Sequence, residues 1–282
     1  MKRLKNIYII GLGMMGTSLC RSFKKHNLDH KITAYDVDDN SIKYCLKNKI
    51  IDFAIDDFSA ITRPDIIIFC TPLSAYEPLI KKVIPYINKN TLITDIGSSK
   101  GKTYLKTAAL IKKSGSNFIS SHPMVGSEKT SFSNSKNDMY KDKVVFLIDN
   151  NNSSKTQYLK LKKFWESIGA QTYNISHTVH DSLMSQTSHV AHLMAYIFIQ
   201  SLPQSILDNH LPLLLGGGIK EHVRLSKSDP TMWSDIFINN SKNISESLDR
   251  IQKNIRTFKS LLDSSSYDKI HKLLEEIAQK TQ

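Results

Sequence analysis

A short motif with three glycines, Gly11-Leu12-Gly13-Met14-Met15-Gly16, most narrowly limits the fold that this chain can adopt. It follows an apolar run at 6–10 and precedes a helical pattern at 17–25. In this setting the first glycine permits a tight turn, the second lets the backbone approach a pyrophosphate, and the third allows close packing of helix on strand. The motif predicts a dinucleotide site at a helix N-terminus. Its cofactor-binding candidates are Gly11, Gly13, Met14, Met15 and Gly16.

A carboxylate at the end of the next apolar run supports this interpretation. Asp36 follows the run at 31–35 and stands about 20 residues after the last glycine, where a carboxylate accepts hydrogen bonds from ribose hydroxyls. The next residues are Val37-Asp38-Asp39, with no Arg to receive a 2′-phosphate, so NAD is favoured over NADP. Thr71 and Pro72 end another strand, where they either line the nicotinamide-ribose side or simply terminate the strand.

The order of the patterns predicts the architecture. Up to residue 176, short β-branched runs alternate with helical patterns, which is typical of a doubly wound, largely parallel sheet with helices on both faces. The expected strands are 6–10, 31–35, 65–70, 91–96, 117–121, 144–148 and 171–175. Afterwards only helices are expected, at 177–202, 219–226, 231–262 and 267–280. We therefore expect an α/β N-terminal Rossmann-type domain (1–176) and an all-α C-terminal domain (177–282).

Composition narrows the range of partners. The net charge is +12, but the lysines are spread along the chain, which indicates a solvated basic surface and no nucleic-acid partner. No run approaches the roughly 18 apolar residues that span a bilayer, and the basic start leads directly into the first strand, so neither a membrane nor a signal peptide is expected. The three cysteines form no C-x-x-C pair. A cytoplasmic protein follows.

The helices expected at 177–202 and 231–262 carry broad apolar faces. These faces are larger than one small helical domain needs to bury, so a second copy of the chain is expected to cover part of them. The sequence thus predicts a homodimer that assembles through the helical domain.

Three further segments carry more polar residues than a core needs: 95–101 (DIGSSKG), 121–129 (SHPMVGSEK) and 216–233 (GGGIKEHVRLSKSDPTMW). With the glycine motif, they resemble the prephenate and arogenate dehydrogenase family, in the same order and over nearly the whole chain. The resemblance implies a Rossmann-type domain joined to a helical dimerisation domain, with the active site between them. It also implies NAD-dependent oxidative decarboxylation of prephenate to 4-hydroxyphenylpyruvate, in tyrosine biosynthesis, without a metal.

The resemblance assigns roles to individual residues. His122 matches the catalytic histidine that takes the proton of the 4-hydroxyl group, and Ser98 matches the serine that assists it by hydrogen bonding. Arg224 matches the arginine that binds the ring carboxylate. Glu221 and Glu128 would orient this arginine, although a plain surface salt bridge is the alternative for Glu221. The other substrate-binding candidates are His192 and Ser188 near the pyruvyl side chain, Ser127 in the histidine loop, and Gly217 and Trp233 around the pocket. The alternative for Trp233 is that it simply anchors the helix packing.

Several alternatives stay open. A metal pair is conceivable at His189 and His192, with His177, His180 and Asp181 close in sequence, but there is no H-E-x-x-H motif and hydride transfer needs no metal. Other two-domain NAD(P) enzymes, such as β-hydroxyacid dehydrogenases or pyrroline-carboxylate reductases, lack the His122 and Arg224 segments. A non-catalytic NAD-binding sensor would have little reason to keep both residues.

The substrate and the domain content remain expectations at this stage. Prephenate and arogenate differ only in a keto or amino group on the side chain, and prephenate is our choice. We expect neither a fused chorismate mutase nor an ACT domain, because the first strand begins at residue 6 and almost nothing follows Lys280.

Overall fold

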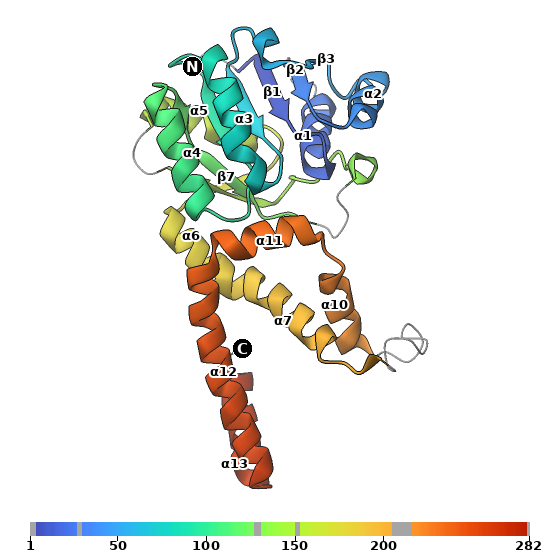
Figure 1. Ribbon diagram of the computed structural model, residues 1–282, viewed down its shortest axis with the longest axis vertical. Coiled ribbons are helices and arrows are strands. Elements are labelled where there is room, and N and C mark those ends of the chain that lie inside the picture. Colours follow the sequence, from blue (N-terminus) through green and yellow to red (C-terminus); the bar gives the residue numbers. More distant parts are fainter. Residues whose placement is uncertain (1–3, 27–29, 127–130, 150–152, 205–215, 281–282) are drawn as a thin grey trace.

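The computed structural model describes residues 4–26, 30–126, 131–149, 153–204 and 216–280. Figure 1 shows an α/β unit with a group of helices below it, from which two long helices project. The expected fold class, a Rossmann-type α/β part followed by an all-α part, is confirmed. Strand structure ends at Asn174 and the first helix of the second part begins at His177.

Six parallel strands form the main sheet, in the spatial order β3-β2-β1-β4-β5-β6. The strands are added outward from β1 toward β3 on one side and from β4 toward β6 on the other, so the order of strand addition reverses between β1 and β4. Ligands of doubly wound sheets bind beyond the carboxyl ends of the strands at such a point. The two-residue strand β3 was not predicted. The strands are β1 (Asn6–Ile10), β2 (Lys31–Tyr35), β3 (Phe53–Ala54), β4 (Ile66–Phe69), β5 (Leu92–Asp95) and β6 (Asn117–Phe118).

Helices cover both faces of this sheet, as expected. Alternate residues of β1 separate into two cores: Ile7 and Ile9 pack toward one face, and Tyr8 and Ile10 toward the other. All of β4 is buried, which is typical of a central parallel strand covered on both sides. The helices on the first face are α1 (Met14–Lys25), α2 (Asp39–Lys47) and α5 (Lys155–Glu166), and those on the second are α3 (Tyr76–Val83) and α4 (Lys102–Lys113).

A second, three-stranded sheet corrects the expectation of a single sheet. It consists of β7 (Ser120–Pro123), β8 (Val144–Ile148) and β9 (Gln171–Asn174), and β7 runs antiparallel to β8. The run at 117–121, expected as one strand, is divided: β6 pairs with β5 and β7 pairs with β8. Strand pairing depends on contacts distant in sequence, which a local pattern does not contain. His122 therefore lies within a strand, not after one.

The second part of the chain is helical throughout its described residues. The segment expected as one helix at 177–202 contains a π-helical turn (Ser185–His189) between α6 (His177–Met184) and α7 (Val190–Gln200). The other helices are α10 (Gly217–Ser226), α11 (Pro230–Asn239), α12 (Ser241–Asp263) and α13 (Tyr267–Gln279). None of the helices in the described ranges is both long enough and apolar enough to cross a membrane.

The single helix expected at 231–262 is in fact two helices, α11 and α12, that meet at Asn240. This residue has φ −110° and ψ 23° and is buried. Its side-chain amide donates to the backbone oxygen of Asp181 (2.8 Å) and lies 3.0 Å from Nδ1 of His189. These long-range hydrogen bonds satisfy a buried amide at the break, and periodicity alone gives no sign of them.

Helix α11 holds the helical part against the Rossmann-type part. A Cβ atom on Gly101 would collide with the backbone oxygen of Asn239, so this position needs glycine for close approach. The side chain of Asn239 accepts a hydrogen bond from the backbone N–H of Thr103 (2.9 Å), in the first turn of α4. Asp235 accepts two more from the backbone and hydroxyl of Ser74 (2.9 and 2.8 Å).

Candidate active site

The glycine motif lies at the carboxyl ends of β1 and β4. Gly11 has φ +103°, and a Cβ atom there would lie 2.7 Å from the backbone oxygen of Cys70. A Cβ atom on Gly16 would collide with the backbone oxygen of Gly11. Helix α1 begins at Met14, three residues earlier than its sequence pattern indicates, and Gly13 at its N-cap provides no side-chain cap. The first N–H groups of α1 can thus bind a phosphate.

Two polar side chains, Asp36 and Thr71, lie close to the glycine motif. The carboxylate of Asp36 accepts hydrogen bonds from the backbone N–H groups of Leu12 and Asp38, and its remaining lone pairs can accept from a ribose. Thr71 lies beside Gly11, and its hydroxyl is buried without a hydrogen-bond partner among the described residues. Pro72 follows it and precedes a 3₁₀ turn at Leu73–Ala75. A polar ligand bound beside Gly11 would satisfy the hydroxyl, so these residues fit a dinucleotide.

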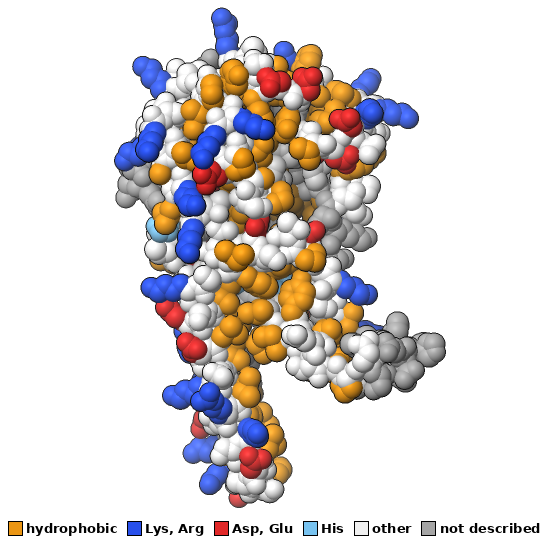
Figure 2. Space-filling view, viewed as in Figure 1, with side chains coloured by type: hydrophobic (Ala, Val, Ile, Leu, Met, Phe, Trp, Pro, Cys, Tyr) orange, Lys and Arg blue, Asp and Glu red, His pale blue; other side chains and the backbone are white. Residues whose placement is uncertain are grey.

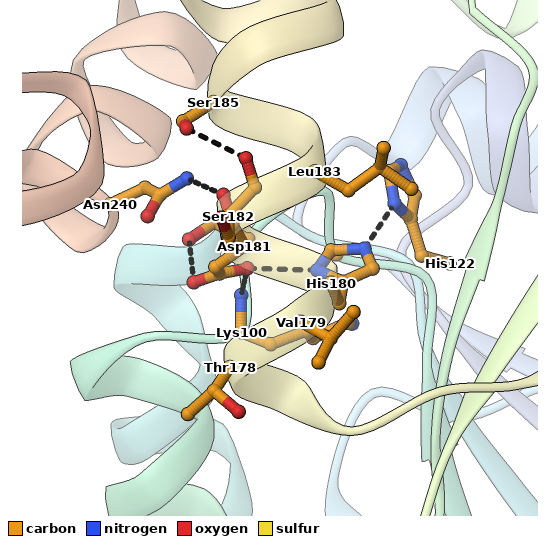
Figure 3. Close-up of polar contacts among 12 residues, drawn as sticks. Lys100, His122, Thr178, Val179, His180, Asp181, Ser182, Leu183, Ser185 and Asn240 are labelled. Carbon is orange, nitrogen blue, oxygen red and sulfur yellow. Dashed lines mark hydrogen bonds and ion pairs between the residues drawn. The ribbon is translucent and has the colours of Figure 1, made fainter. Parts of the chain in front are cut away.

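A line of three side chains crosses from the second sheet to α6 (Figure 3). His122, in β7, is only 6% exposed, and its Nδ1 lies 2.8 Å from Nε2 of His180. Nδ1 of His180 lies 2.8 Å from the carboxylate of Asp181. That carboxylate also accepts hydrogen bonds from the backbone N–H of Lys100 (2.7 Å) and the hydroxyl of Ser99 (3.3 Å). The candidate base is therefore bonded to the helical part of the chain.

A buried ion pair lies next to this line. Nζ of Lys100 is 2.8 Å from the carboxylate of Asp95 and donates to the backbone oxygen of Ser121 (2.9 Å). The two side chains are 0% and 3% exposed. Burial lowers the pKa of Lys100, and the negative charge of Asp95 opposes this shift. The pair joins the end of β5 to β7 and places a cation near His122.

Burial keeps the histidines of this region neutral. The pKa of His122 is held well below 6.5, first by burial and then by the neighbouring His180, Lys100 and His189. Burial also lowers the pKa of His180, against the effect of Asp181, and lowers the pKa of His189 to about 4. A neutral imidazole can accept a proton, so His122 is in the protonation state that a general base needs near pH 7.

These depressed values predict a stability that falls in mild acid. Below pH 6.5 the unfolded chain takes up protons that the folded chain does not, so the free energy of unfolding is at its full value above pH 6.5 and decreases as the pH falls toward the folded pKa values. For His189, with a pKa of about 4, the total loss is about 3 kcal/mol. Urea unfolding followed from neutral pH down to pH 5 checks this, and His189→Gln should flatten the dependence. If the free energy of unfolding of the unaltered chain changed with pH as little as that of His189→Gln, the prediction would be contradicted.

A second cluster lies at the junction of α7, α10 and α11. The ring of His192 stacks on Trp233 at a centroid distance of 3.8 Å, and its Nδ1 donates to the backbone oxygen of Ser188 (3.0 Å). Burial lowers the pKa of His192, and the positive charge of Arg224 adds to this effect. Trp233 is buried, and its indole N–H has no hydrogen-bond partner in the described part of the chain.

Arg224 forms a two-point ion pair with Glu221 one turn earlier on α10, with distances of 2.9 and 2.6 Å. The two side chains are 49% and 59% exposed, so water screens the pair and its contribution to stability is small. Gly217 is the first residue of this helix, and a Cβ atom there would meet nothing within 4 Å among the described atoms.

The structure does not bring all the predicted residues together. Ser98 is partly buried, and no hydrogen bond joins it to His122 within the described ranges. Its backbone lies close enough to His189 to oppose the lowering of the pKa of that histidine. Ser127 and Glu128 lie outside the described residues. The closest hydrogen-bond partner of His122 is His180, which the sequence offered only as a possible metal ligand. The described residues contain no group of three or more His, Cys, Asp and Glu that is arranged to hold a metal ion.

Sequence reasoning missed Lys100 and Asn240, and it offered Asp181 only as a neighbour of possible metal ligands. Each acts through a buried contact with another element, and sequence spacing does not reveal such contacts. The one available signal was a lysine within the short polar segment 95–101, directly after a strand.

A doubly wound sheet with a glycine motif that fits a dinucleotide, together with a neutral, buried histidine, is the arrangement expected of a two-part dehydrogenase. Family models support this class over almost the whole chain. The model described as "Prephenate dehydrogenase, nucleotide-binding domain" matches residues 19–174, and the one described as "Prephenate dehydrogenase, dimerization domain" matches residues 176–276. The chain belongs to the prephenate dehydrogenase family.

Individual relatives agree with this assignment. The chain is 29% identical to prephenate dehydrogenase of Bacillus subtilis (strain 168) over 262 residues, which cover 91% of this chain and 69% of that protein. It is 25% identical to cyclohexadienyl dehydrogenase of Zymomonas mobilis, over 94% and 90% of the two chains. Prephenate dehydrogenase from A. aeolicus, solved with hydroxyphenyl propionate and NAD+, superposes with a TM-score of 0.90 at 27% identity, over 99% and 98%. The NAD prediction agrees with these findings.

Proposed function

We propose that this chain is an NAD-dependent prephenate dehydrogenase that converts prephenate to 4-hydroxyphenylpyruvate in tyrosine biosynthesis. The observation that carries the proposal is the buried, neutral His122, hydrogen-bonded across the domain junction. Arogenate, which would give tyrosine directly, is the alternative substrate. The relatives include a cyclohexadienyl dehydrogenase as well as a prephenate dehydrogenase, so the choice between the two substrates needs a direct measurement.

In the proposed reaction, His122 accepts the proton of the 4-hydroxyl group as that oxygen becomes a carbonyl. The glycine motif, Asp36, Thr71 and Pro72 would hold NAD, which would supply the hydride acceptor. Carbon dioxide leaves from the opposite ring carbon, and formation of the aromatic ring drives this step. The chain itself must place the ring accurately and remove one proton.

Other residues have proposed binding roles. The guanidinium of Arg224 has the planar donor geometry that suits the ring carboxylate, and Glu221 pairs with it in two-point fashion. His192, Ser188 and Trp233 form one cluster, which suits the pyruvyl side chain. Ser98 as the partner of His122, and Ser127, Glu128 and Gly217 around the substrate, keep the roles that the family resemblance implies.

We further propose a cytoplasmic homodimer. Figure 2 shows hydrophobic side chains over α7 and along the α12–α13 hairpin. Such an exposed apolar surface is typical of an interface with a second copy, and the model that matches this part describes a dimerization domain. The exposed apolar residues are Ile197 and Phe198 on α7, Ile255 and Leu262 on α12, and Leu274 and Ile277 on α13.

The test is NADH or NADPH formation from prephenate and from arogenate, each with NAD and with NADP. We expect kcat/KM to be highest for prephenate with NAD, by about tenfold or more over each other combination. A higher value for arogenate would favour the alternative substrate. Binding of NAD without turnover of either compound would favour the non-catalytic sensor and contradict the proposal.

A further inference from the structure

The line formed by Asp181, His180 and His122 fixes where the protons lie. The Asp181 oxygen that faces His180 also accepts the backbone N–H of Lys100, which can only donate. This oxygen is therefore an acceptor, and Nδ1 of His180 carries a proton. In the neutral ring the other nitrogen, Nε2, is then an acceptor as well.

The same logic extends to His122. Its Nδ1 lies 2.8 Å from the accepting Nε2 of His180, so Nδ1 of His122 carries the proton and donates. The unprotonated lone pair of a neutral His122 is then on Nε2. Within the described residues, Nε2 of His122 makes no hydrogen bond to the protein, so this atom remains for a substrate hydroxyl.

The charged groups around His122 and His180 also have a definite arrangement. His122 and His180 are buried, and the charged and titratable groups near them are Asp181, Asp95, Lys100 and His189. Lys100 is paired with Asp95. The carboxylate of Asp181 is thus available to balance a positive charge that develops on the two imidazoles.

We propose that His180 and Asp181 are positioning residues for proton removal: they hold His122 as the Nδ1–H tautomer and stabilise the imidazolium that it becomes. This inference rests on the proposed function. As the O–H bond of the substrate breaks, an N–H bond forms at Nε2 of His122. The electron pair of the O–H bond forms the carbonyl, and the hydride of the same carbon would pass to bound NAD. His122 then carries one positive charge, and its hydrogen bond to His180 becomes charge-assisted and stronger.

A merely structural role is the alternative, because the same hydrogen bonds also join β7 to α6. Three variants separate the two roles. His180→Leu removes the acceptor for Nδ1, His180→Gln keeps an acceptor oxygen without the imidazole, and Asp181→Asn keeps the shape but removes the charge. His177→Gln is the matched control: it lies on the same helix, and its ring contacts Tyr104.

We expect kcat with prephenate and NAD to fall roughly 100-fold in His180→Leu and roughly tenfold in His180→Gln and Asp181→Asn, with KM nearly unchanged. In a plot of kcat against pH, the acidic limb reports the protonation of His122. This limb should move to lower pH in Asp181→Asn, because the negative charge that favours an imidazolium is lost. His177→Gln should match the unaltered enzyme. Losses in kcat below about threefold in all three variants would overturn the proposal.

Nitrogen NMR of the histidine-labelled, unaltered protein gives a test that needs no variant to fold and no turnover. We expect His122 to be protonated at Nδ1 and unprotonated at Nε2, with its signal assigned by its loss in His122→Asn. Protonation at Nε2 would overturn the inference. If neither substrate were turned over, the proposed function would fail while this measurement still decided the tautomer.

Discussion

His122→Asn is expected to lower kcat for prephenate oxidation by roughly 10²- to 10⁴-fold, the usual contribution of a positioned general base. Asparagine can still accept one hydrogen bond, but it cannot take up a proton near neutral pH. The NAD dissociation constant should stay near that of the unaltered enzyme, because the glycine motif follows β1 and Asp36 follows β2, whereas His122 lies in β7. Steady-state kinetics and a direct NAD-binding titration measure the two effects separately.

The control for this prediction is His177→Asn, in which a partly buried histidine of α6 is changed in the same way without touching His122. It should retain kcat within about twofold. Normal turnover by His122→Asn would mean that another group removes the proton. Loss of NAD binding together with turnover would mean that the substitution had disturbed the fold.

Lys100→Met should lower the free energy of unfolding by about 3–5 kcal/mol, because it leaves a buried carboxylate without its cation. The side chains of Lys100 and Asp95 are 0% and 3% exposed, so water cannot replace the lost partner without a rearrangement. Asp95 would keep its hydrogen bonds from Ser120 and the backbone of Gly97, which recover only part of the loss. Unfolding in guanidinium chloride, followed by fluorescence of the tryptophan in α5, measures the change.

The double variant Asp95→Asn with Lys100→Met provides the matched control. Removing both charges should restore stability substantially, since the cost comes from an unpaired buried charge and not from the loss of a strong attraction. A loss below about 1 kcal/mol in Lys100→Met would show that the carboxylate is solvated or protonated without cost. Equal losses in the single and double variants would point to packing instead of charge.

Local features of the chain were readable from sequence. The run of buried residues in β4 lies within one strand, so its pattern predicted part of the sheet. The glycine motif lies within a single strand-to-helix turn, so its pattern predicted the dinucleotide site. Asp36 was identified in the same way, because its separation from the glycine motif along the chain is set mainly by helix α1.

The sequence-based predictions that were wrong concern features that depend on contacts between distant segments of the chain. The division of 117–121 into β6 and β7, and the helix break at Asn240, arise from partners that lie far away in the chain. His180 is separated from His122 by 58 residues and reaches it only because α6 docks on the second sheet. The family resemblance supplied His122 itself, but sequence spacing carried no information on which nitrogen of its ring would bear the proton.

The hydrogen bond between β7 and α6 limits how freely the two halves of this protein can be recombined. A nucleotide-binding half grafted onto a foreign helical partner would still contain the imidazole, but not the neighbour that orients its proton. Chimeric enzymes built at this seam would therefore have to exchange the strand and the helix as one unit.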